Sequence, residues 1–197
     1  MNNMNSYFNE IMKRFFLKYT MLGISILSVL SCSSDLDFNQ GNDLALEPVL
    51  VANLATFDIP AHQFVSGGIE QPQFVDVPNF DLFKDSFFKN NLLKVEFFFE
   101  INNTINRDYV IDLVLLDADD IPLYSISIPV PAYTGLENLV KKTEPFESSN
   151  LPLLTSTRKM SFTITMLSPG PILSENSLGS LKLRSSTTGY FSIKWEN

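Results

Sequence analysis

Cysteine and histidine each occur only once in the 197 residues, as Cys32 and His62. A single cysteine excludes an intramolecular disulfide and a zinc site built from several cysteines. A single histidine leaves little material for a Ser or Cys hydrolase, whose nucleophile needs a base within hydrogen-bond reach. The sequence also lacks the GxSxG elbow, the HExxH zinc motif and a glycine-rich phosphate loop. We therefore expect no enzymatic activity, no catalytic residue and no bound cofactor.

Positive charge is scarce as well, with 14 Lys and Arg against 22 Asp and Glu and a formal net charge of -8. Such a surface repels phosphate backbones, so the composition argues against nucleic acid as a partner. Hydrophobic residues make up 45% of the chain, which is enough to build one globular domain around an apolar core. No repeat of about 20 to 50 residues is visible, which disfavours a propeller or a solenoid.

A short apolar segment near the start has the layout of a secretory signal. Lys13, Arg14 and Lys18 precede a mostly apolar run over residues 19–30. The order of positive, apolar and then small residues is typical of a signal peptide. The run falls short of the roughly 20 residues that a permanent transmembrane helix needs. We therefore expect an exported protein that does not span the membrane.

The apolar run ends in Val29-Leu30-Ser31-Cys32, which resembles the lipobox of bacterial lipoproteins. That motif has an aliphatic residue three positions before an obligatory cysteine and a small residue directly before it. The resemblance implies that residues 1–31 are a signal peptide, that Cys32 carries a diacylglycerol and that its new amino group is acylated. Several acyl chains hold a protein on a membrane essentially irreversibly. Apart from this covalent lipid, no cofactor is implied.

The residues around the expected anchor bear on where the chain starts and where it is located. Met1 and Met12 are the two candidate starts of translation, and we expect Met12 because it directly precedes the positive residues. Residues 33–37 read Ser-Ser-Asp-Leu-Asp and resemble the export stretch of Bacteroidota lipoproteins. This resemblance implies a lipid-anchored protein of the outer membrane, on the cell surface or on the periplasmic face. Residues 32–43 are polar and predict a flexible tether.

The mature chain reads as β-strands. Apolar and polar residues alternate over 93–101, 109–115, 124–130, 160–166 and 191–195, which is the period of a half-buried strand. Weaker patterns predict strands over 49–57 and around Leu181 and Leu183. Phe98 is out of step with the alternation of its own strand. Six to eight short strands joined by turns predict an all-β, antiparallel β-sandwich over residues 44–197.

A few segments depart from the strand pattern and predict one or two short helices. Asn79 is placed to cap a helix that carries Phe80, Phe83 and Phe87 on one face. Residues 135–142 predict a second short helix, and residues 151–158 a weaker third. The segment Asn102-Asn103-Thr104 is interpreted as a hairpin turn.

Ten of the 17 phenylalanines lie between Phe57 and Phe99. One interpretation is that Phe80, Phe83 and Phe87 close one end of the sandwich as core residues. The other is that part of the segment forms an exposed apolar patch that binds a membrane protein. The candidate partner-binding residues are Phe64, Phe74, Phe80, Phe83, Phe87 and Phe88.

An acidic segment with Asp117, Asp119 and Asp120 is the only weak candidate for a metal site, because Ca²⁺ takes several carboxylate oxygens. It lacks the glycine and the distal glutamate of an EF-hand loop. It lies between two predicted strands, where a hairpin needs turn residues. We therefore expect an ordinary acidic turn, with weak calcium binding as the alternative.

These observations lead to a function hypothesis and two alternatives. We expect a non-catalytic outer-membrane lipoprotein that is an accessory or recognition subunit of a complex for β-barrel assembly, secretion or nutrient import. Its partners would be the membrane, through the lipid, and an outer-membrane β-barrel protein. One alternative is a surface glycan-binding lipoprotein in which Trp195, Tyr124, Tyr133 or Tyr190 stacks on sugar rings. The other is a structural protein of the cell envelope.

Overall fold

The computed structural model describes residues 12–21, 45–80, 82–83 and 85–194. Residues 12–21 are helical. None of the helices in these ranges has both the length and the hydropathy needed to cross a bilayer. The expected lipidation site Cys32, the cleavage site and the tether lie outside the described residues.

The domain that begins near Ala45 is a sandwich of two four-stranded antiparallel sheets. One sheet has the order β2-β11-β6-β9, made of β2 (Val49–Pro60), β11 (Ser180–Phe191), β6 (Leu92–Asn103) and β9 (Leu139–Glu147). The other has the order β5-β10-β7-β8, made of β5 (Gln73–Asp76), β10 (Lys159–Met166), β7 (Tyr109–Leu116) and β8 (Pro122–Val130). The predicted all-β sandwich is confirmed.

The path of the chain through the two sheets defines the topology. Among these eight strands only β7 and β8 are consecutive neighbours within one sheet, and every other connection passes from one sheet to the other. This double Greek-key order is that of a jelly roll. Two small ladders complete the domain: β1 (Ala45–Leu46) with β12 (Ile193–Lys194), and β3 (Val65–Ser66) with β4 (Ile69–Glu70).

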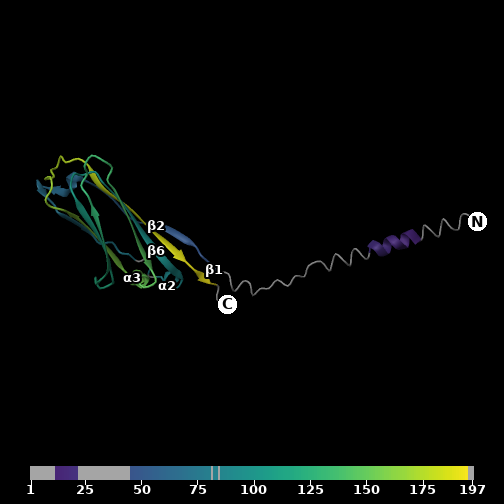
Figure 1. Cartoon of the computed structure of the whole chain (residues 1–197). Helices are drawn as coiled ribbons and strands as arrows, with labels where there is room; N and C mark the ends of the chain where they lie inside the picture. The colour runs from purple at the N-terminus through teal and green to yellow at the C-terminus, as the bar shows by residue number, and fades with distance from the viewer. Residues whose placement is uncertain (1–11, 22–44, 81, 84, 195–197) are drawn as a thin grey trace, which may run out of the picture. The chain divides into compact units, whose positions relative to one another are not determined.

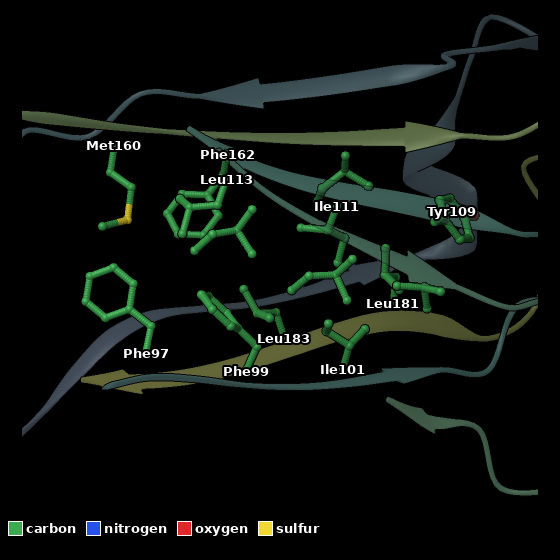
Figure 2. Close-up of a cluster of buried hydrophobic side chains, with 14 of the residues drawn as sticks. Phe97, Phe99, Ile101, Tyr109, Ile111, Leu113, Met160, Phe162, Leu181 and Leu183 are labelled. Atoms are coloured by element: carbon green, nitrogen blue, oxygen red, sulfur yellow. The ribbon is translucent and has the colours of Figure 1, made fainter. Parts of the chain in front are cut away.

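The core fills the space between the sheets and follows from the alternation of the sequence. From β6, Phe97, Phe99 and Ile101 point inward and are buried, whereas Phe98 points outward. Figure 2 shows Phe97, Phe99 and Ile101 beside Leu181 and Leu183, facing Ile111, Leu113, Met160 and Phe162 of the other sheet. Burying each such side chain stabilises the fold by roughly 1.5–3 kcal/mol. The predicted strands at residues 93–101, 109–115, 124–130, 160–166 and 49–57 are all present.

The end of the chain differs from prediction because one strand was interpreted as two. β11 runs without interruption from Ser180 to Phe191, and β12 follows as a short separate strand. The inward positions of β11 include Ser185, Thr187 and Gly189. These polar or small residues hide the apolar period in the sequence.

One predicted helix is wrong and another begins later than predicted, and tertiary pairing explains both differences. Residues 139–147 form the edge strand β9, in which exposed and covered residues alternate, instead of a helix over 135–142. Asn79 does not cap a helix, because it forms a β-bridge with Lys159. Helix α2 is Ser86–Asn91 and is capped by Asp85, whose carboxylate accepts from Phe87 N at 2.7 Å. The weak prediction over 151–158 is confirmed by α3 (Leu151–Ser156).

Candidate functional site

Four connections meet at one end of the sandwich and form a surface that we call the loop tip: residues 61–72, 104–108, 131–138 and 167–179. The 3-10 helix η2 (Ala61–Phe64) and the β3–β4 ladder lie in the first of them. Backbone hydrogen bonds join the four, from Ala61 N to Gly179 O, Tyr133 N to Ile105 O, and Leu167 N to Asp108 O, each 2.9 Å. β1, α2 and α3 lie at the opposite end of the sandwich (Figure 1).

A buried arginine holds three of these connections together. Arg107 is 4% exposed, and its Nη1 donates to Pro171 O at 2.8 Å while its Nη2 donates to Glu70 Oε2 at 3.1 Å. Glu70 Oε1 in turn accepts from Leu173 N at 2.7 Å. Gly170 packs so closely that an added Cβ would lie 2.7 Å from Cδ of Arg107. Removing one partner of a buried ion pair is strongly destabilising, so this pair keeps the loop tip in one arrangement.

A second buried side chain, Asn103, fixes the remaining connection. Its Oδ1 accepts from Ile105 N at 2.9 Å, and its Nδ2 donates to Arg107 O and to Pro131 O, both at 2.8 Å. The hairpin turn predicted at residues 102–104 is therefore wrong. The chain leaves the sheet of β6 here and enters the other sheet at β7. The side-chain amide of Asn103 satisfies backbone groups of this connection, which in a tight hairpin would bond to each other.

Tyr109 lies directly beneath the loop tip (Figure 2). Its ring packs against that of Phe64, with centroids 4.9 Å apart. Its buried hydroxyl finds no hydrogen-bond partner among the described residues. Burial raises the pKa of this hydroxyl, the charge of Arg107 opposes the rise, and the charge of Glu70 adds to it. Tyr109 is thus uncharged at neutral pH, where it packs beneath the loop tip and does not act as an acid–base group.

The loop tip exposes apolar side chains on this rigid base. Ile69, Leu136, Ile172 and Leu178 are 69%, 76%, 85% and 89% exposed. Ile69 directly precedes Glu70, and Ile172 directly precedes Leu173, whose N–H donates to the Glu70 carboxylate. Exposed apolar side chains that gather on one surface are typical of sites that contact another molecule.

The six candidate phenylalanines do not form one exposed patch. Phe64 and Phe83 are fully buried, whereas Phe74, Phe80 and Phe88 are half-buried against the core. Phe87 is exposed and stacks on Phe191 with centroids 5.6 Å apart. The interpretation of these rings as the closure of one end fits Phe80 and Phe83, which pack together at 5.6 Å.

The acidic segment forms the predicted turn between β7 and β8. Asp117 Oδ1 accepts from Asp119 N at 2.8 Å and from Ile121 N at 2.9 Å. Asp120 has a φ of 64° and pairs with Lys159 at 2.6 Å. The carboxylates of Asp117 and Asp120 are thus occupied by contacts of the turn. Over residues 12–21, 45–80, 82–83 and 85–194, no group of three or more His, Cys, Asp or Glu could hold a metal ion.

The remaining candidates are placed as follows. His62 is exposed on η2. Of the aromatic residues considered for sugar stacking, Tyr124 donates its hydroxyl to Glu144 at 2.5 Å and Tyr190 donates to Glu96 at 3.1 Å. Tyr133 is half-buried in the loop tip, and Trp195 lies outside the described residues.

Sequence reasoning missed both the Arg107–Glu70 pair and the loop tip. The two partners are 37 positions apart, and no local pattern marks either one. Phe98, in contrast, could be noticed in the sequence. It is an apolar residue at a position of β6 where the alternation calls for an outward-facing side chain. It lies on the outer face of the sheet, away from the loop tip.

Comparison with known proteins identifies no family. No family model and no curated protein matches the chain. Among solved structures, the VP2 subviral particle of infectious bursal disease virus has 12% identity and a TM-score of 0.40, with coverage of 78% of this chain and 34% of that one. A Parabacteroides distasonis protein thought to be secreted has 16% identity and a TM-score of 0.38, with coverage of 64% and 38%. The chain thus spans little more than a third of each of these two proteins.

A tymovirus, Desmodium yellow mottle virus, has 10% identity and a TM-score of 0.32, with coverage of 77% of this chain and 92% of that one. Distant structural similarity therefore extends to virus capsid proteins and to one Bacteroidota protein. The assignment of the fold rests on the strand order of the two sheets.

Proposed function

We propose that this protein is a non-catalytic, lipid-anchored lipoprotein of the outer membrane that acts as a recognition subunit of an outer-membrane protein complex. The lipid anchor is the one that the lipobox resemblance implies at Cys32. The partner is an integral β-barrel protein of the same membrane or a component of its complex. The observation that carries the proposal is the loop tip, where exposed apolar side chains are fixed on a buried ion pair.

The position of the loop tip within the domain supports this role. The chain enters the sandwich at β1, and the loop tip lies at the other end (Figure 1). A protein held to the membrane by residues that precede β1 can therefore present its loop tip to another protein. Aliphatic anchors in fixed positions lose little conformational entropy on binding, which favours specific association.

The test is purification of the full chain, tagged at Asn197, from its native membranes in mild detergent, followed by mass spectrometry. The tested variant combines Ile172→Ser and Leu178→Ser. The matched control is Ile121→Ser, which removes an exposed apolar side chain at the opposite end. We expect a stoichiometric β-barrel partner with the native chain and with the control, and its loss with the tip variant. Recovery of the native chain alone, or of a partner with all variants, would contradict the proposal.

A further inference from the structure

The outer face of the β2-β11-β6-β9 sheet is polar except for a small number of side chains, and its strand register fixes how they are arranged. Across the middle of the sheet, Asn53, Ser186, Phe98 and Thr143 form one row. The next row contains Thr56, Arg184, Glu100 and Lys141. Phe98 is thus an aromatic ring, 36% exposed, set among hydrogen-bonding side chains.

This face is hollowed around Phe98. The outer-face hollow has a volume of about 660 Å³, and its lining includes Asn53, Asp58, Phe98, Glu100, Lys182 and Arg184. An adjoining hollow of about 500 Å³ shares Glu100, Lys182 and Arg184 and extends toward Asn102 and Thr104. Each volume falls in the range of small-molecule sites, and together they form a track along the strands.

A β-bulge beside Phe98 shapes the hollow. The pairing of β11 with β2 shifts between Arg184 and Ser186, so that two residues of β2 lie opposite Ser185. The buried Ser185 hydroxyl donates to Ala55 O at 2.8 Å and accepts from Ala55 N at 2.9 Å. This hydroxyl satisfies the backbone that the bulge leaves unpaired. Bulges redirect neighbouring side chains and are common beside binding sites.

Two cations, Lys182 and Arg184, line the outer-face hollow, and among the described residues only Lys182 has an acidic partner. Lys182 pairs with Asp58 at 2.9 Å, and Glu100 of the lining pairs at 3.4 Å with Lys141, which lies outside it. Within the described part of the chain, Arg184 forms no ion pair. It faces the hollow two residues along β11 from Ser186, the residue that pairs with Phe98. A guanidinium binds a carboxylate through two parallel hydrogen bonds.

From this geometry we infer a binding site for an extended saccharide that carries a carboxylate, as a uronic acid does. The apolar face of one sugar ring packs on Phe98. The carboxylate binds Arg184, and the hydroxyls bind Asn53, Glu100 and Lys182. This site goes beyond the proposed function and does not depend on it, because the lining of the outer-face hollow contains no residue of the loop tip, and only the adjoining hollow reaches it, at Thr104.

Other classes of ligand fit the outer-face hollow less well. A protein interface has an apolar core from which charged residues are depleted, whereas on this face the row next to Phe98 contains Arg184, Glu100 and Lys141. A nucleic acid requires several cations that neutralise phosphates. The lining of the outer-face hollow contains only two cations, and one of them, Lys182, is paired with Asp58.

The test measures binding of the full-length mature chain in detergent to an oligogalacturonate tetrasaccharide, with cellotetraose as the uncharged match, by isothermal titration calorimetry. We expect the oligogalacturonate to bind and the neutral sugar to bind at least tenfold more weakly. The variants Phe98→Ala and Arg184→Gln should each weaken oligogalacturonate binding by roughly tenfold. Leu93→Ala, an exposed apolar residue on the same strand outside the hollow, should bind as the native chain does.

Three results would overturn the inference. These are no binding of oligogalacturonate by the native chain, equal binding of the two sugars, or native affinity in both Phe98→Ala and Arg184→Gln. The melting temperature of each variant is measured alongside. Because Phe98 and Arg184 both face outward, we expect the melting temperature of each variant to stay near the native value. The two variants then test the site independently of each other.

Discussion

The loop tip and the outer-face hollow differ in what they bury and in what they expose. The loop tip exposes aliphatic side chains and is held from beneath by a buried ion pair, Arg107 with Glu70. The outer-face hollow exposes polar and charged side chains and lies on a sheet whose other side is the hydrophobic core. A surface that binds needs a rigid support. In the loop tip this support comes from buried polar contacts, and in the outer-face hollow it comes from the apolar packing beneath the sheet.

The largest contrast we expect is between two neighbouring phenylalanines of β6. Phe99→Ala should lower the free energy of unfolding by about 3–5 kcal/mol, because Phe99 is buried between the sheets. Phe98→Ala should lower it by less than about 1 kcal/mol, because Phe98 faces the outer-face hollow. Urea unfolding followed by circular dichroism measures both. Equal losses would refute the assignment of the two faces of β6.

The support of the loop tip can be broken at Arg107. Arg107→Met should cost about 3 kcal/mol of stability, because it leaves the Glu70 carboxylate without its cation in a mostly buried position. Lys141→Met breaks an exposed pair with Glu100 and should cost less than about 1 kcal/mol. Urea unfolding of both variants decides the matter. A similar small cost for both would mean that the buried pair does not hold the loop tip.

The support of the outer-face hollow can be weakened at Ser185. Ser185→Ala should cost about 2 kcal/mol, since it leaves the N–H and the C=O of Ala55 without a partner. Ser186→Ala, on the outward face of the same strand, is the matched control and should change stability by less than about 0.5 kcal/mol. Thermal unfolding compares the two. If Ser186→Ala proved the more damaging, the account of the bulge would be wrong.

The smallest effect on stability is expected at Tyr109, beneath the loop tip, and it appears only at alkaline pH. The pKa of Tyr109 is raised in the folded state, so its stabilising contribution is complete below its ordinary value of 10.0 and is lost as the pH rises above it. Tyr109→Phe removes the titrating hydroxyl. Between about pH 8 and about pH 11, the variant should therefore lose about 1 kcal/mol less stability than the native chain. Parallel loss in both proteins would show that Tyr109 does not titrate with folding.

The same contrast between strands and loops governs what the sequence could predict. Strand alternation predicted most of the sandwich and marked Phe98 as outward, because side chains follow the period of two along a strand. It missed the continuity of β11, whose inward positions include Ser185, Thr187 and Gly189. The loop tip was not predictable, because Arg107 and Glu70 come together only through the tertiary fold. The helix expected over 135–142 failed since the edge of a sheet offered its backbone a pairing partner, β6.

Site-specific photo-crosslinking in native membranes tests directly whether the loop tip and the outer-face hollow contact different partners. A photoreactive residue is placed at Ile172 in the loop tip in one variant and at Ser186 in the outer-face hollow in another. We expect a discrete protein adduct from position 172 and none from position 186. Adducts to the same protein from both positions, or from position 186 alone, would contradict the division of the molecule into a loop tip that binds protein and a hollow that binds saccharide.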